Sequence, residues 1–139
     1  MFDVFGDLNW LAIIVATVIY YALGGLWFSQ LVFGKAWGKS IGFDRPKEWK
    51  ETTIYYIGPL IGCLITTITT AILSYALNIQ SLDDALLLGL IAGIGYGGAV
   101  STTNAITPTN PRPLMYGMIT GAYHALGIII VSTIIFSLK

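Results

Sequence analysis

The sequence contains little charge. Only 10% of its 139 residues are Asp, Glu, Lys or Arg, whereas a soluble domain usually carries about 25%. Hydrophobic residues make up 55% of the chain, so the composition suits lipid as the solvent. The formal net charge is zero, which leaves no bulk attraction to nucleic acid, and we expect no nucleic-acid partner.

Residues that bind metals are also scarce. Cys63 is the only cysteine and His124 is the only histidine. A single cysteine excludes an intrachain disulfide, and one histidine with one cysteine gives too few ligands for a zinc site within one chain. We therefore expect no metal site and no cofactor. The chain is also not expected to be an enzyme. Its one candidate pair of nucleophile and base is Cys63 with His124, and these two residues are far apart in the sequence.

Long apolar runs take the place of charge. A helix that crosses a bilayer needs about 20 mostly apolar residues, and four segments qualify: about 8–33, 53–77, 84–106 and 113–138. None contains Lys, Arg or Glu in its apolar body. The sequence therefore predicts an all-α protein with one transmembrane domain over residues 1–139, built as an integral membrane four-helix bundle.

The basic residues predict the orientation of this bundle. Six of the seven fall in the loops after the first and third segments: Lys35, Lys39, Arg45, Lys47, Lys50 and Arg112. Loops rich in Lys and Arg stay in the cytoplasm. We therefore expect a multi-pass protein of the cell membrane whose first and third loops are cytoplasmic and whose termini are both extracytoplasmic.

Four tryptophans are candidate anchors at the membrane interface: Trp10, Trp27, Trp37 and Trp49. Tryptophan is enriched at the level of the lipid headgroups. In the first loop, Trp37, Phe43 and Trp49 alternate with lysines, which favours a segment lying along the headgroups. A plain solvated loop is the alternative.

Small residues recur every fourth position in three of the segments. The series are Gly58, Gly62, Thr66, Thr70 and Ser74; Gly89, Gly93, Gly97, Ser101 and Ala105; and Gly117, Gly121 and Ala125. Residues four apart share one face of a helix, and faces without bulk let membrane helices pack closely. The faces are expected to pack within the bundle, between subunits of a homo-oligomer, most simply a dimer, or around a pore or ligand groove.

His124 lies near the middle of the fourth segment. Ionisable residues inside a membrane are expensive and often functional. Tyr96, Tyr21 and Cys63 are predicted to lie at a similar depth, whereas Tyr123 points about 100° away around the same helix. Three interpretations are open: a structural hydrogen bond, a proton-relay or solute site, and a metal site. We expect a neutral His124 hydrogen-bonded to a tyrosine.

Several motifs resemble a known family. They are Asn9-Trp10, Gly24 with Trp27 and Phe28, Phe33 to Trp37, Arg112-Pro113, and Ala122-Tyr123-His124. Nearly the whole chain resembles the bacterial and archaeal membrane family catalogued as domain of unknown function 1761. The resemblance implies four spanning helices and no established activity, so fold analogy supplies none.

Two functions remain open from the sequence. The first is a small homo-oligomeric transporter or channel for a small neutral solute, with His124, Tyr96, Tyr21 and Asn104 as a candidate polar site. A water-accessible cavity reaching His124 would favour it. The second is a structural or accessory subunit of a larger membrane complex, which a dry bundle core would favour. For Asn104, helix capping or an interface bond is expected ahead of substrate contact.

Overall fold

The computed structural model describes residues 4–139, and this part of the chain is helical with no strand. Its elements are α1 (Val4–Asp7), α2 (Trp10–Trp27), α3 (Gly34–Ser40), α4 (Ile54–Ala76), α5 (Leu82–Ala92), the π-helix η1 (Gly93–Gly98), α6 (Ala99–Ala105) and α7 (Pro113–Ser137). Among the described residues, four helices are long and apolar enough to cross a membrane: α2, α4, the continuous α5–η1–α6 and α7. The predicted all-helical fold with four membrane-spanning helices is confirmed at this level.

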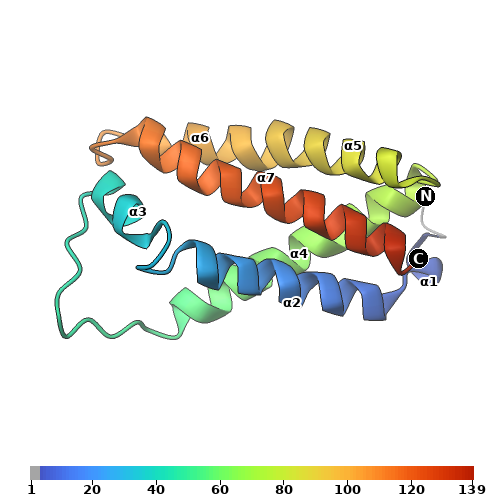
Figure 1. Ribbon diagram of the computed structural model, residues 1–139, viewed down its shortest axis with the longest axis horizontal. Helices are drawn as coiled ribbons and strands as arrows, with labels where there is room; N and C mark the ends of the chain where they lie inside the picture. Colours follow the sequence, from blue (N-terminus) through green and yellow to red (C-terminus); the bar gives the residue numbers. More distant parts are fainter. Residues whose placement is uncertain (1–3) are drawn as a thin grey trace.

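The four long helices run along one axis, as Figure 1 shows. The first and third loops meet at one end, which we name the loop end, where the backbone N–H of Arg112 donates to the carbonyl of Ser40 (3.1 Å). The start of α2, the C-terminus and the short turn after α4 meet at the other end, the terminal end (Figure 1). There the Asn9 side chain donates to the carbonyl of Leu138 (2.6 Å).

The starts of three of the spanning helices follow local chemistry, whereas α4 begins after Thr53 without a side-chain cap. The Asn9 side chain accepts from the backbone N–H of Ala12, and Ser81 accepts from that of Asp84, which satisfies first-turn donors of α2 and α5. Pro113 occupies the first turn of α7, where its missing N–H is tolerated. Polar residues at segment boundaries therefore predict helix starts well.

The first span is shorter than the predicted segment 8–33. Helix α2 ends at Trp27 and the chain reverses, with the N–H of Phe33 donating to the carbonyl of Trp27 (3.0 Å) and that of Gly34 donating to Ser29 (2.8 Å). A Cβ at Gly34 would collide with the carbonyl oxygen of Phe28. A tight turn that needs this glycine, followed by α3, takes the place of the last predicted helical turn.

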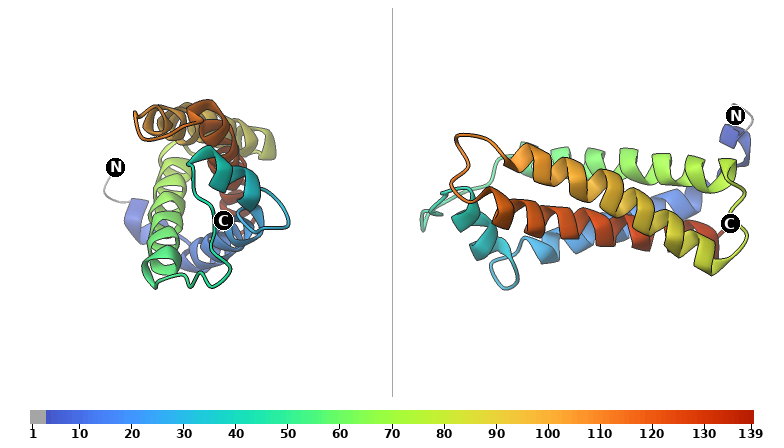
Figure 2. Two further views of the ribbon diagram at one scale, coloured as in Figure 1. Left: turned by 90° about the vertical axis from the view of Figure 1, so that its left-hand side faces the viewer. Right: turned by 90° about the horizontal axis from the view of Figure 1, so that it is seen from above.

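Helix α7 is the central element of the fold. It contacts the α5–η1–α6 helix on one side and α2 and α4 on the other, whereas α5–η1–α6 barely meets α4. Figure 2 shows α7 beside α6 in the end-on view and beside α5 in the view from above. The structure therefore consists of two packing interfaces that share α7.

Glycines bring α7 and the third span into backbone contact. A Cβ at Gly89 would lie 2.6 Å from the Cα of Ile129, and one at Gly93 would lie 2.7 Å from the carbonyl oxygen of Ala125. Real side chains do not approach this closely, so only glycine fits at these two positions. Packing within the bundle, one of the three expected uses of the small-residue faces, is therefore present between the third and fourth segments.

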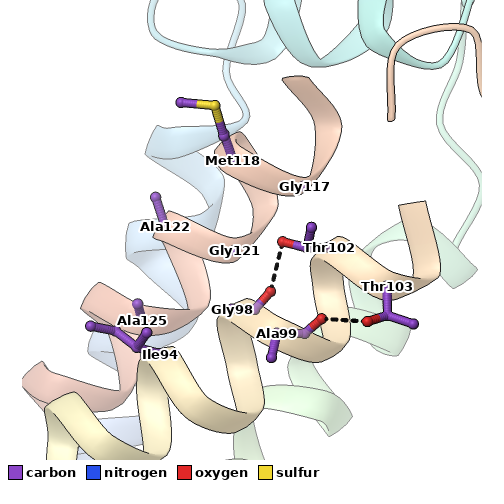
Figure 3. Close-up of a pocket in the computed structure, with 10 residues that line it drawn as sticks. All are labelled: Ile94, Gly98, Ala99, Thr102, Thr103, Gly117, Met118, Gly121, Ala122 and Ala125. Atoms are coloured by element: carbon purple, nitrogen blue, oxygen red, sulfur yellow. Dashed lines mark hydrogen bonds between the residues drawn. The ribbon is translucent and has the colours of Figure 1, made fainter. Parts of the chain in front are cut away.

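The π-helix η1 changes which residues face α7. After Gly93, the residues that meet α7 are Gly98, next to Gly121, and Thr102, next to Gly117 (Figure 3). A π turn contains an extra residue, so the contact face moves from the predicted series of every fourth residue to a series displaced by one. Gly97 still meets α7, because a Cβ there would lie 3.0 Å from the Cβ of His124.

The glycines of α4 are different. A Cβ at Gly62 would meet nothing within 4 Å, and one at Gly58 would meet only the side chain of Ile54 on the same helix. The prediction that these two residues pack against another helix is therefore not fulfilled within a single chain. The buried residues of α4 are Cys63, Thr67, Thr70, Ala71 and Ser74. The predicted series drifts around the helix, so its last members, Thr70 and Ser74, reach the buried face although its glycines do not.

Candidate functional site: a cavity that reaches His124

A cavity of about 1140 Å³ opens at the loop end, between α2, α3, α4, α7 and the first loop. Ligand sites in proteins usually measure roughly 300–1,000 Å³, so this volume is ample for a small molecule. Its lining is rich in aromatic rings: Tyr21, Phe28, Trp37, Phe43, Trp49, Tyr55, Tyr56, Tyr116 and Tyr123, with His124 at its deep end.

His124 is hydrogen-bonded at this deep end. Its Nδ1 lies 2.5 Å from the hydroxyl oxygen of Tyr20, and the two rings meet edge to face with centroids 6.2 Å apart. Tyr20 is only 1% exposed. Its ring fits there because Gly127 has no side chain, since a Cβ at that position would collide with the ring.

Tyr123 completes the deep end next to His124. Its hydroxyl donates to the carbonyl oxygen of Tyr20 (3.3 Å) and lies 3.5 Å from the sulfur of Cys63. The hydroxyl fits against α2 at Gly24, where a Cβ would be 2.7 Å from it. The ring stacks near those of Tyr20 and Phe28, with both centroid distances 5.2 Å.

Beyond this layer the bundle is closed. Toward the terminal end, α2, α4 and α7 meet through side chains that are almost fully buried, including Ala12, Ala16, Ala71, Val131 and Ile135. Small residues on α2 and α4 let these helices approach one another. The cavity therefore ends at Tyr20, Tyr123 and His124 and does not cross the bundle.

The first loop covers the outer part of the cavity. Trp37 packs against Phe28 and Tyr116 (centroids 5.8 and 6.2 Å), and Phe43 packs against Trp49 (5.0 Å). Loop residues that the sequence places along the headgroups thus face one another and the cavity. Neither the headgroup interpretation nor the plain solvated loop predicts this arrangement.

Charges at the cavity are few. Arg45 and Glu51 both line it and form an ion pair at 2.9 Å, and Lys35 is the remaining ionised side chain of the lining. The Glu51 carboxylate is therefore neutralised by its neighbour. The cavity offers no unpaired acid to a cation.

Two hydroxyl groups of the lining lack a partner. The side-chain oxygens of Ser29 on the turn after α2 and Thr120 on α7 are buried from solvent and make no hydrogen bond. Buried polar atoms in folded proteins are nearly always paired. The hydroxyls of Thr17, Thr67 and Ser74, outside the lining, are buried and unpaired in the same way, so these two atoms do not by themselves mark a ligand position.

The structure brings only part of the predicted polar site together. Tyr21 lines the cavity, and its hydroxyl donates to the carbonyl oxygen of Tyr56 (3.1 Å) rather than to His124. Tyr96 lies next to Gly97, which meets His124, but its side chain is 74% exposed and outside the cavity lining, so it is not the partner of His124. Asn104 is exposed on α6, outside the cavity lining.

The expected hydrogen bond between His124 and a tyrosine is present, but the partner is Tyr20. Neighbouring residues lie at nearly the same depth along the bundle, so a comparison of depths does not distinguish Tyr21 from Tyr20. In the structure it is Tyr20 that faces α7. Successive residues point about 100° apart around a helix. The angle of about 100° between adjacent side chains also excludes Tyr123 from the predicted site. In the structure, the Tyr123 hydroxyl nevertheless donates to the carbonyl oxygen of Tyr20. Because the residues around Tyr20 are mostly apolar, the local sequence does not indicate toward which helix its side chain points.

The tryptophans divide into two groups. Trp10, near the terminal end, is exposed, and Trp49 on the first loop is 36% exposed. Trp27 and Trp37 are half-buried, and the indole N–H of Trp27 donates to the carbonyl of Ile119 (3.1 Å). Trp27 and Trp37 thus tie α2 and α3 to α7 in addition to any contact with lipid.

Cys63 and His124 are not hydrogen-bonded to each other. The sulfur of Cys63 has Tyr123 as its partner, and His124 has Tyr20. Within residues 4–139, no three His, Cys, Asp or Glu side chains gather in a way that could hold a metal ion. The groups that the structure brings together at the deep end of the cavity are hydrogen-bonding side chains and aromatic rings.

Comparisons with known proteins give the family of the chain. The searches of curated proteins and of solved structures found no match. A family model described as "Protein of unknown function (DUF1761)" matches residues 11–136, which is nearly the whole chain and includes Tyr20, Tyr123 and His124. This protein therefore belongs to the DUF1761 family.

Proposed function

We propose that this protein binds a small uncharged solute in the cavity at the loop end and moves it across the membrane. The observation that carries the proposal is a single cavity, about 1140 Å³ in volume, that leads from the first loop to His124 inside a spanning helix. In this proposal the protein binds and releases its solute, and no bond is made or broken.

The closed half of the bundle determines how such movement would occur. Because α2, α4 and α7 are tightly packed beyond Tyr20 and His124, the solute has access from one end at a time. A carrier that alternates between two open states fits this geometry better than an open channel. The Tyr20–His124 hydrogen bond would then separate when the terminal end opens.

The orientation and assembly belong to the same proposal. The loops of the loop end hold six of the seven basic residues, so we place that end in the cytoplasm of a cell membrane. We place a second copy of the chain against α4, because Gly58 and Gly62 leave one of its faces without side-chain bulk. The assembly is a homodimer in this view.

Thiol labelling tests whether water reaches the cavity. In a Cys63→Ser background, a cysteine replaces Thr120 in the cavity, Ile65 on the exposed face of α4, or Ala71 in the closed half. A charged, membrane-impermeant thiol reagent is expected to label only the Thr120 variant, since a thiol reacts as the thiolate in water. Absence of labelling at Thr120 in folded protein would contradict a solute-accessible cavity.

Uptake into liposomes tests transport separately. Phenyl glucoside is uncharged, aromatic and too polar to cross lipid quickly, so it is a suitable radiolabelled probe. Liposomes containing the protein are expected to take it up faster than liposomes containing the variant Thr120→Trp, whose indole narrows the cavity next to His124. Equal uptake by both, with the cavity accessible to thiol reagents, would restrict the function to binding.

An accessory subunit of a larger membrane complex is the second candidate. The open glycine face of α4 favours it, and so does the shallow groove that Ile94, Gly98, Gly121 and Met118 line on the outer surface of η1 and α7 (Figure 3). Native mass spectrometry of the protein extracted in mild detergent distinguishes the candidates. A mass that contains another protein favours the accessory subunit, whereas one or two copies of this chain alone favour the carrier.

A further inference from the structure

The hydroxyl of Tyr20 determines the tautomer of His124. Tyr20 is 1% exposed, and its hydroxyl makes one hydrogen bond, to Nδ1 of His124 at 2.5 Å. A buried hydroxyl hydrogen needs an acceptor, so Tyr20 donates and Nδ1 accepts. A neutral imidazole carries one N–H, and we assign it to Nε2.

The Nε2–H group is free to bind another molecule. No second hydrogen bond to the ring is present among the described residues, and Nε2 is not one of the buried unpaired atoms. The side chain of His124 lines the cavity. The deep end of the cavity therefore presents a hydrogen-bond donor in a fixed tautomer.

The remainder of the lining favours flat aromatic surface. The rings of Phe28, Trp37, Tyr116 and Tyr123 line the cavity between the loop and His124. Aromatic rings stack with one another in offset or edge-to-face arrangements. The one carboxylate of the lining, Glu51, is paired with Arg45, and Lys35 is an exposed residue of α3, so neither a cation nor an anion meets a buried unpaired charge in the lining.

We infer that the ligand of this cavity is an uncharged, planar aromatic molecule with an oxygen acceptor that binds Nε2–H of His124. This inference rests on the proposed solute-binding function and adds to it the chemical class of the solute.

Nitrogen-15 NMR of the protein in lipid nanodiscs tests the tautomer directly. His124 is the only histidine, so labelled histidine gives one pair of ring signals. The expected spectrum has a protonated Nε2 and an unprotonated Nδ1, and Tyr20→Phe is expected to remove this preference. A protonated Nδ1 in the wild-type protein would overturn the assignment and the inference.

Matched aromatic probes test the ligand class. Acetylanthracene and ethylanthracene have nearly the same size and shape, but only the first has an oxygen acceptor. Equilibrium dialysis against nanodiscs measures binding of each probe, and Thr120→Trp, whose indole narrows the cavity next to His124, supplies the background. We expect acetylanthracene to bind about fivefold more tightly than ethylanthracene, as for the loss of one hydrogen bond.

Variants of His124 connect the preference to this residue. His124→Phe is expected to abolish the preference for acetylanthracene, and His124→Gln, which keeps a side-chain N–H donor, is expected to retain most of it. A preference that survives His124→Phe would overturn the inference. Tighter binding of anthracene carboxylate than of acetylanthracene would overturn the uncharged class.

The failure of this inference can be separated from the failure of the proposed function. If both neutral probes bind equally, and more strongly than to Thr120→Trp, the cavity binds solutes but His124 does not select them. If neither probe binds above that background and thiol reagents do not label the cavity, the solute-binding function itself is wrong.

Discussion

Helix α7 meets its neighbours in two different ways. Toward α5–η1–α6 the contact is backbone against backbone, with Gly89 against Ile129 and Gly93 against Ala125. Toward α2 and α4, at the loop end, the contact is ring against ring and ring against backbone, through Tyr123 of α7.

This difference explains why α7 packs without a gap against α5–η1–α6 and borders a cavity on its other side. Backbone contact leaves no space between helices, whereas rings hold helices apart and leave room between them. Glycines are present on both sides, but at Gly24 and Gly127 they accommodate the rings of Tyr123 and Tyr20 rather than another backbone. The cavity lies on the side where rings act as spacers.

The largest effect is expected where backbones touch. Gly93→Val introduces a side chain 2.7 Å from the carbonyl oxygen of Ala125, and we expect a loss of stability of about 3 kcal/mol or failure to fold. Gly95→Val is the matched control, because a Cβ there meets nothing within 4 Å, and its effect should stay within about 0.5 kcal/mol. Thermal unfolding of both variants in the same detergent measures the difference, and equal melting temperatures would contradict the two-interface description.

A smaller effect is expected on the aromatic side. Tyr20→Phe removes the hydroxyl that pairs with His124 and leaves Nδ1 without a partner, and we expect a loss of about 1.5 kcal/mol. Tyr21→Phe is the control, since its hydroxyl bonds to Tyr56 in an exposed position. Thermal unfolding compares the two variants, and a larger loss for Tyr21→Phe would mean that Tyr20 is not the partner of His124.

The smallest effect concerns one hydroxyl between α7 and α5. Ser132 donates to the carbonyl of Ala85 on the neighbouring helix (2.7 Å), and bonds between membrane helices average about 0.6 kcal/mol. We expect Ser132→Ala to lose that amount. Thr133→Val should lose almost nothing, because the Thr133 hydroxyl bonds to Ile129 of its own helix. Unfolding by sodium dodecyl sulfate resolves such differences, and equal values would show that the interhelical bond adds no stability.

Much of the architecture is predictable from the order of residues. Runs without charge identify the four spanning helices, and Ser81 and Pro113 mark where two of them begin. A spacing of four between small residues correctly predicts that Gly89 and Gly93 pack closely. These are local properties, because hydropathy and capping depend on residues within a few turns of each other.

The direction in which each helix presents a given residue is not predictable in this way. The same spacing of glycines gives close packing in α5 and an open surface in α4, and the π-helix displaces the contact face after Gly93. Adjacent tyrosines diverge in the same way, with Tyr20 on His124 and Tyr21 on Tyr56. A local pattern does not contain the information that distinguishes these cases.

The sequence by itself determined that the chain is helical, apolar and able to cross a membrane four times. Only the tertiary structure decided that Tyr20 is the partner of His124 and that a cavity ends there. The physical reason is that transfer into lipid sums over residues along a helix, whereas the rotation of each helix about its axis is set by all of its contacts at once.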